Sequence, residues 1–170
     1  MYRNYDEIEK EYKDTRIPYS ILLTSFEWKH FRDLIMREQG FICQICQQKP
    51  NYLAWELKSQ YPNSNIYARP IENGTEYSCT HIVMHLHHKY YINNRLPWQY
   101  RKEVLQTLCA ECHTEVHKNQ VIMKYQTEIL ENPEPTTNCK KCLGTGYIDE
   151  YHYYQSGICF MCDGKGYSEK

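Results

Sequence analysis

A central run, LHHKYYINNRLPWQYRKEVLQTLCAECHTEVH, carries four histidines, three of which could bind one metal ion. His113 and His117 are four residues apart, so on a helix their rings lie on one face and can converge on one point. His87, at the end of a facing strand, would supply a third ligand. Three protein ligands leave positions open for water and a phosphate oxygen, as in catalytic metal sites. His88 is then the candidate general base, because the ordinary pKa of histidine lies near neutrality.

The alternative is that the His-x3-His pair lies on an exposed helix face and that the adjacent His87 and His88 are incidental. For one motif alone this alternative would be preferred. The two motifs flank a Cys-x-x-Cys pair, Cys109–Cys112, and that combination favours a metal site.

A second pair, Cys43–Cys46, precedes this region, with 62 residues between the two pairs. The first residues, MYRNYDEIEKEYK, contain no secretory apolar segment, so we expect a reducing, cytoplasmic setting in a phage or bacterial cell. There, paired Cys-x-x-Cys units indicate zinc rather than disulfides. We therefore predict that Cys43, Cys46, Cys109 and Cys112 share one structural zinc; four buried thiols are the alternative.

The C-terminal part contains an internal repeat, CKKCLGTG and CFMCDGKG, with a 20-residue period. Sixteen residues separate Cys142 from Cys159, a spacing typical of four-cysteine zinc sites. The glycines permit the tight turns that point backbone amides at the sulfurs. The repeat resembles the CxxCxGxG units of the DnaJ-type chaperone zinc domain, which implies a zinc module but not chaperone activity. The expected ligands of this second structural zinc are Cys139, Cys142, Cys159 and Cys162.

A helix is expected before the first cysteine pair. Thr24 and Glu27 have the spacing of a capping box, and Gly40 is placed to end the helix. The helix should dock an aromatic stripe on the central domain through Trp28, Phe31, Leu34 and Ile35.

The elements that must position the histidines follow from patterning along the chain. The run from Thr80 predicts a strand leading into His87, Leu105–Leu108 a second strand, and Glu111–Lys118 a helix. A hairpin around Asn73-Gly74 is expected within Ile71–Glu76, and a short turn at Pro97. The domains predicted are an arm (1–20, either a helix broken before Pro18 or a loose segment), a central domain (21–125), a linker (126–138) and the zinc module (139–170).

The composition fits a small domain that needs metal for stability. Of 170 residues, 41% are hydrophobic, but 17 are tyrosines, so the aliphatic core is thin. No apolar run approaches the roughly 18 residues of a membrane span. The net charge is −1, yet residues 81–124 carry a net charge of +3 and residues 126–170 one of −3, a distribution compatible with phosphate binding at the centre.

The order of these motifs over about residues 24–120 resembles the HNH endonucleases of the ββα-metal fold. The matching residues are Trp28, Arg32, Gly40, Cys43, Cys46, Leu86, His87, His88, Tyr91, Pro97, Trp98, Tyr100, Leu105, Leu108, Cys109, Cys112, His113 and His117. The resemblance implies an α+β fold, cleavage of DNA phosphodiester bonds, His88 as the base, and a divalent ion held by His87, His113 and His117.

Two positions depart from the family pattern. Val104 stands where many members have Asn or Asp, a residue that helps to orient the base. Either the enzyme is weakened, or Glu103, Asn93 or Asn94 orients the base instead. His87 stands where other members have Asp, and neutral imidazole favours Zn²⁺, Ni²⁺ or Mn²⁺ over Mg²⁺.

The partner expected from this interpretation is DNA, with Arg95, Arg101 and Lys118 as candidate phosphate contacts. One such site cuts one strand, so a double-strand break needs a homodimer, a larger assembly or two events. The rival interpretation is a catalytically weak or inactive zinc-stapled nucleic-acid-binding module. The other histidines, His30, His81, His85 and His152, are expected at the surface, although His85 would share the strand face of His87.

Overall fold

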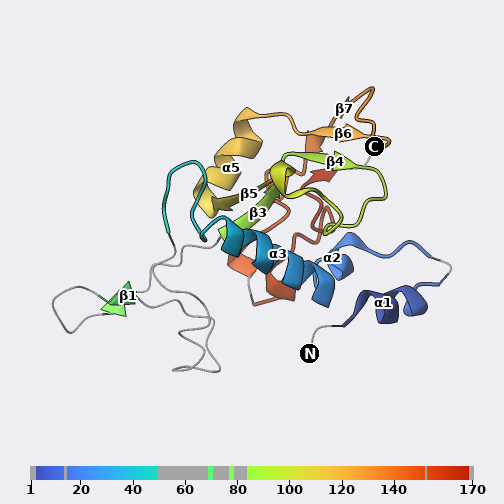
Figure 1. Ribbon diagram of the computed structural model, residues 1–170, viewed down its shortest axis with the longest axis horizontal. Helices are drawn as coiled ribbons and strands as arrows, with labels where there is room; N and C mark the ends of the chain where they lie inside the picture. Colours follow the sequence, from blue (N-terminus) through green and yellow to red (C-terminus); the bar gives the residue numbers. More distant parts are fainter. Residues whose placement is uncertain are drawn as a thin grey trace.

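A computed structural model describes residues 3–13, 15–49, 69–70, 77–78, 84–151 and 153–168. It shows a small mixed α/β protein with short helices and small sheets (Figure 1). Within these residues no helix has the length and apolar character needed to cross a membrane.

Two antiparallel strands and the helix that follows them form the centre of the molecule. β3 (Met84–His88) pairs with β5 (Leu105–Cys109), with His87 opposite Gln106. α5 (Ala110–Asn119) begins directly where β5 ends and packs against both strands (Figure 1). The strand and helix predictions for this region are confirmed. Because β3 and α5 face each other, histidines from both elements can meet.

α3 (Phe26–Glu38) covers the strand pair from another side and contacts β5. It ends as predicted. Gly40 adopts φ +68°, its amide donates to Arg37 O, and the amide of Phe41 donates to Met36 O at 2.8 Å. This pair of bonds is the Schellman arrangement, which satisfies the last carbonyls of a helix.

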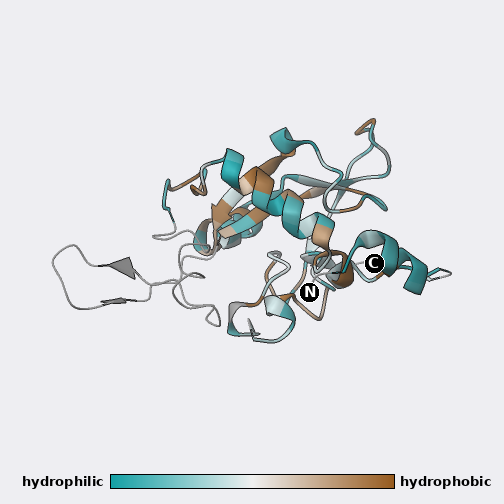
Figure 2. Cartoon of the chain, turned by 60° about the horizontal axis from the view of Figure 1, so that its bottom comes forward, coloured by the Kyte–Doolittle hydropathy of each residue, from teal (hydrophilic) through white to brown (hydrophobic). Residues whose placement is uncertain are grey.

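The start and the buried stripe of α3 differ from the prediction by one residue each. The N-cap is Ser25, not Thr24: Ser25 Oγ accepts the Trp28 amide at 3.2 Å. Glu27 is not part of a capping box, since its carboxylate accepts the Tyr5 amide instead. Trp28, Phe31 and Ile35 pack inward as expected, but Leu34 is 46% exposed and Met36 takes its place in the core. Figure 2 shows polar and apolar residues interspersed along the helices.

Ser25→Ala should lower the free energy of unfolding by about 1–2 kcal/mol, because it removes the cap of α3 and buries an unpaired amide. Thr24→Ala is the matched control and should cost less, because Thr24 Oγ1 donates to the Ile21 carbonyl and, among the described residues, accepts no amide of α3. Urea unfolding followed by circular dichroism measures both. Equal losses in the two variants would contradict Ser25 as the cap.

The N-terminal segment is helical rather than a loose arm. α1 (Tyr5–Glu11) buries Ile8 completely, and the Tyr5 ring packs edge-on against Trp98. Pro18 then caps α2 (Tyr19–Leu22). The arm is therefore part of the fold on one side of α3.

The segment expected as a linker is hydrogen-bonded to the central region. β6 (Met123–Tyr125) pairs in parallel with β4 (Tyr90–Ile92) and antiparallel with β7 (Glu134–Pro135). The amide of Thr136 also bonds Ile122 O at 3.0 Å. Residues 126–138 thus reverse the chain direction, so that β7 runs antiparallel to β6.

The C-terminal module is built around its cysteines. β8 (Thr137–Asn138) pairs with β9 (Tyr167–Ser168), and short 3-10 turns occupy Asp149–Tyr151 and Gln155–Gly157. Its buried cluster comprises four cysteines with Ile148. With so little aliphatic surface, the module depends on what the thiols bind.

Three further segments complete the described chain. β1 (Arg69–Pro70) pairs antiparallel with β2 (Tyr77–Ser78), and a 3-10 turn, Lys102–Val104, precedes β5. The predicted hairpin residues 71–76, the start of the strand at Thr80, and the histidines His81 and His152 lie outside the described residues.

Candidate metal centre and catalytic site

The structure brings His87, His113 and His117 together, as the sequence predicts. Each offers one ring nitrogen, and the three nitrogens lie within 4.8 Å of one another. The Nε2 atoms of His113 and His117 are 3.1 Å apart. Two nitrogens bound to one tetrahedral zinc at its usual bond length would be about 3.3 Å apart, so this pair is already at ligand spacing.

The charge state of the cluster also suits a metal ion. All three rings are at most 5% exposed. Burial lowers the pKa of His87 to about 3 and that of His117 to about 4, and burial together with the other histidines lowers the pKa of His113. Neutral imidazole is the form that binds metal. The three Nδ1 atoms are buried without a hydrogen-bond partner among the described residues, and an ion held at Nε2 of His113 and His117 would leave the Nδ1 atoms of those two rings unchanged.

His88 is next to His87 in the sequence, but its ring packs against Trp28, Pro97 and Tyr100. Its Nε2 is 3.0 Å from the Pro97 carbonyl oxygen, which can only accept, so Nε2 carries the proton and Nδ1 is the basic nitrogen. The ring is stacked on Trp28 at 5.7 Å and meets Tyr100 edge-on at 4.5 Å. Burial lowers the pKa of His88 to about 4, against the opposing effect of the Pro97 hydrogen bond. The ring is therefore neutral at pH 7 and fixed in orientation.

A backbone carbonyl, that of Pro97, holds the His88 ring, and the side chain of Val104 does not. Val104 packs beside the core, and its carbonyl accepts the Lys89 amide. Among the side chains considered as orienting groups, Asn93 bonds Gln126, and no hydrogen bond joins Glu103 or Asn94 to His88 within the part of the chain that the structure describes. A backbone carbonyl carries no side-chain signature, so the sequence could not identify it.

The first cysteine cluster connects the segment after α3 with the junction between β5 and α5. Cys43, Cys46, Cys109 and Cys112 offer sulfurs within 4.8 Å of one another, and the sulfurs of Cys46 and Cys109 are 3.7 Å apart. Tetrahedral zinc with its usual sulfur bond length requires about 3.8 Å, and a disulfide about 2 Å. Burial raises the pKa of Cys43, but backbone hydrogen bonds, led by that involving Cys109, bring it down to about 6. The geometry fits a zinc tetrathiolate.

The second cluster has internal two-fold symmetry that follows the sequence repeat. Sulfur separations are 3.9 Å for Cys139–Cys159 and 3.7 Å for Cys142–Cys162. The amides of Gly146 and Gly166 each donate to the sulfur four residues earlier, both at 3.2 Å. At either glycine an added Cβ would lie within 2.3 Å of the other knuckle's carbonyl oxygen, so the knuckles pack backbone to backbone. The repeat therefore builds one closed four-sulfur site.

This C-terminal module packs directly on the histidine cluster. An added Cβ at Gly144 would lie 2.7 Å from His117 Cβ, and the side chain of Asn138 donates to the His117 carbonyl. At the opposite end, Asp163 accepts the Tyr19 amide. The module is thus in contact with a proposed metal ligand.

Between the module and the central domain lies a cavity of about 270 Å³. Its floor includes His85, His87, His88 and His113, and its far wall includes Thr145, Tyr147, Ser156 and Lys165 of the module. Lys29 and Arg32 of α3 add positive charge, although burial and the neighbouring Arg32 lower the pKa of Lys29. The cavity places cations around the histidines, as a phosphate group would require.

Gly144→Ala should weaken metal binding at the histidine cluster and destabilise the module. Gly144 has φ +101°, and the new methyl group would collide with Cβ, Cγ and Nδ1 of His117. The matched control is Gly40→Ala, which also has positive φ but whose Cβ would meet only the Ile42 side chain at 3.4 Å. Isothermal titration with Mn²⁺ and thermal unfolding measure the two effects. Unchanged Mn²⁺ affinity in Gly144→Ala would contradict this contact.

The prediction that His85 lies at the surface is wrong. This histidine is half-buried, and its ring lies 5.0 Å from both the His113 and Tyr147 rings. Burial lowers its pKa to about 4. The expectation from strand alternation that residues 85 and 87 share one face is confirmed, since both rings lie against that of His113. His30 is exposed, as expected.

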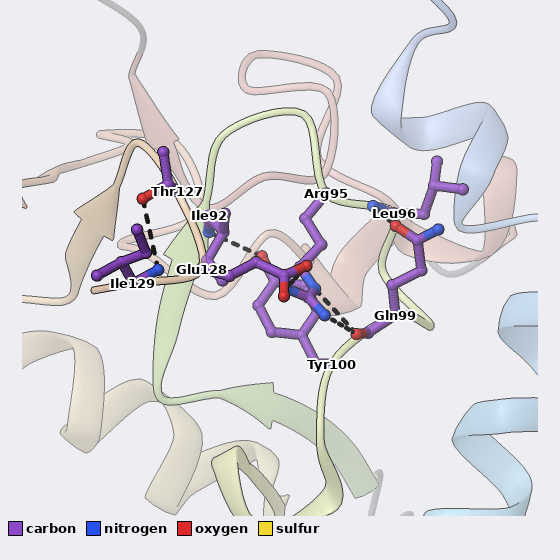
Figure 3. Close-up of polar contacts among 8 residues, drawn as sticks. All are labelled: Ile92, Arg95, Leu96, Gln99, Tyr100, Thr127, Glu128 and Ile129. Atoms are coloured by element: carbon purple, nitrogen blue, oxygen red, sulfur yellow. Dashed lines mark hydrogen bonds and ion pairs between the residues drawn. The ribbon is translucent and has the colours of Figure 1, made fainter. Parts of the chain in front are cut away.

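The candidate phosphate contacts have different surroundings. The Arg95 guanidinium donates twice to Gln99 O, pairs with Glu128 at 2.8 Å and lies over the Tyr100 ring (Figure 3). This side chain supports the Tyr100 ring that packs on His88. Arg101 and Lys118 are exposed, and Lys118 pairs with Glu115 at 3.3 Å.

Comparisons with family models, curated proteins and solved structures found no match for this chain.

Proposed function

We propose that the protein is a metal-dependent endonuclease of the HNH, ββα-metal type that hydrolyses phosphodiester bonds in DNA. The observation that carries the proposal is the arrangement of His88 beside the three-histidine cluster. A purely structural metal site has no use for an adjacent neutral histidine whose Nε2 is tied to a backbone carbonyl. Such a group is suited to water activation, because a positioned neutral histidine can accept the proton of the attacking water.

In this proposal His87, His113 and His117 hold a divalent ion, which supplies positive charge to the pentavalent transition state and the leaving oxygen. His88 accepts the proton of the attacking water at Nδ1. The Pro97 carbonyl holds the Nε2 proton, so the ring has the right tautomer before substrate arrives, and Trp28 and Tyr100 prevent it from turning. Lys29, Arg32 and Lys165 line the same cavity and can attract the phosphate.

A site with three imidazole ligands should prefer Mn²⁺, Ni²⁺ or Zn²⁺ to Mg²⁺. The test is a plasmid nicking assay with each of these four ions, with supercoiled DNA and enzyme in excess. We expect nicked circles in Mn²⁺ or Ni²⁺ and less product in Mg²⁺. Intact supercoiled plasmid under all four conditions would refute the nuclease proposal for DNA.

The second candidate is a zinc-stapled nucleic-acid-binding module without catalysis. It is favoured by Val104 at the usual Asn or Asp position and by the C-terminal module that walls the cavity. It predicts DNA binding without nicking in any metal. Cleavage of both strands by the first candidate would need two copies of the chain, a larger assembly, or two successive nicks.

A further inference from the structure

A second cavity adjoins the catalytic one and has a different lining. Its volume is about 350 Å³, within the range of pockets that bind small organic groups. It lies between the segment after α1, the loop that follows β4, and the C-terminal module. Five tyrosines line it: Tyr12, Tyr19, Tyr91, Tyr100 and Tyr167.

The charged residues along this cavity are mostly basic. Among its described lining residues, Lys13, Arg16, Arg95 and Lys165 are cationic, and Glu9 is acidic. Of these cations, Arg95 pairs with Glu128, which is not among the lining residues. The lining therefore carries more basic than acidic side chains, which favours an anionic ligand.

The two cavities are neighbours. Tyr19, Tyr91 and Lys165 line both. A strand whose phosphate lies at the histidine cluster therefore meets the tyrosine-lined cavity next. Lys165, which comes from the C-terminal module, stands between the two.

The combination of aromatic rings and cations matches a nucleotide, which has a flat base and an anionic phosphate. Aromatic side chains stack on the faces of bases, and this requires a base that is not stacked within a duplex. A paired base could stack on these rings only by leaving its partner.

We propose that the tyrosine-lined cavity binds one unpaired nucleotide next to the scissile phosphate, so that the preferred substrate is DNA with a single-stranded segment at the cut. This inference rests on the proposed nuclease function for the position of the cut. The binding of the nucleotide rests on the cavity alone. Tyr12 and Lys13, the lining residues that directly follow α1, lie outside the proposed catalytic machinery.

The test measures binding separately from cleavage. Full-length His88→Gln protein is titrated against a fluorescein-labelled 12-nucleotide single strand and its blunt duplex, and anisotropy gives the dissociation constants. We expect tighter binding of the single strand. Tyr12→Ala should weaken that binding by roughly 5- to 140-fold, the range for loss of one stacked base. Tyr12→Phe, which keeps the ring, should bind as the parent does.

The same assay tests whether Lys13 contacts a phosphate of the bound strand. Lys13→Ala should flatten the dependence of log affinity on log salt by about 0.7, the value for one phosphate contact to a single strand. The matched controls are Lys10→Ala, on α1 and not among the residues that line the cavity, and Tyr154→Ala, an exposed tyrosine of the module. Both should change neither quantity. Zinc content and circular dichroism verify that each variant is folded.

Unchanged single-strand affinity in folded Tyr12→Ala and Lys13→Ala would overturn the inference, as would an equal loss for the blunt duplex. Neither result touches the nuclease proposal, which is tested by plasmid nicking with wild-type protein. Conversely, absence of nicking together with the expected binding changes would refute the nuclease and leave the nucleotide site standing.

Discussion

His88→Gln should lower the rate of DNA cleavage by roughly 10²- to 10⁴-fold, the usual contribution of a general base. Glutamine is preferred to alanine because its amide can still donate to the Pro97 carbonyl and fill the space between Trp28 and Tyr100. It cannot take a proton from water. The measurement is the single-turnover nicking rate in the metal that best supports the wild type.

His30→Gln is the matched control, because His30 is an exposed histidine on α3 that stacks on Phe26. It should cleave at the wild-type rate. Metal content and thermal unfolding of His88→Gln should match those of the wild type, which separates lost chemistry from lost structure. A folded His88→Gln protein with wild-type activity would remove His88 from the reaction.

Cys109→Ser should unfold the central domain and abolish every activity. Cys109 ends β5, contributes a sulfur to the first cluster and, as the N-cap of α5, accepts the Cys112 amide at 3.4 Å. α5 in turn carries His113 and His117. Structural zinc contributes about 10–16 kcal/mol in small zinc domains, whereas a whole domain is stable by only about 5–15 kcal/mol. Losing the zinc therefore outweighs what the thin aliphatic core can supply.

Mass spectrometry of intact protein should show about one zinc fewer per chain in Cys109→Ser, and circular dichroism should show loss of the cooperative transition. Cys79→Ser is the control, since Cys79 belongs to neither Cys-x-x-Cys pair of the central region nor to the C-terminal repeat. A folded Cys109→Ser protein with full zinc content would refute a shared tetrathiolate site.

Much of the candidate site could be predicted because its signals are local. A Cys-x-x-Cys pair needs only one turn of backbone to present two sulfurs, and a His-x3-His pair needs only one turn of α5. The clusters predicted at Cys43/Cys109 and at the C-terminal repeat are confirmed in their composition. The error at Thr24 arose because the adjacent Ser25 was equally plausible by type. At Leu34, packing buried Met36, two positions further on, instead.

The sequence by itself determined which residues form each metal cluster, because ligand type and spacing are properties of short segments. Only the tertiary structure decided how His88 is held, since its acceptor is the carbonyl of Pro97 and every residue has a carbonyl. Tertiary structure also placed the C-terminal module against His117 and moved His85 from the expected surface into the site. Those contacts join segments far apart in the chain, and they depend on surfaces that exist only after each segment has folded.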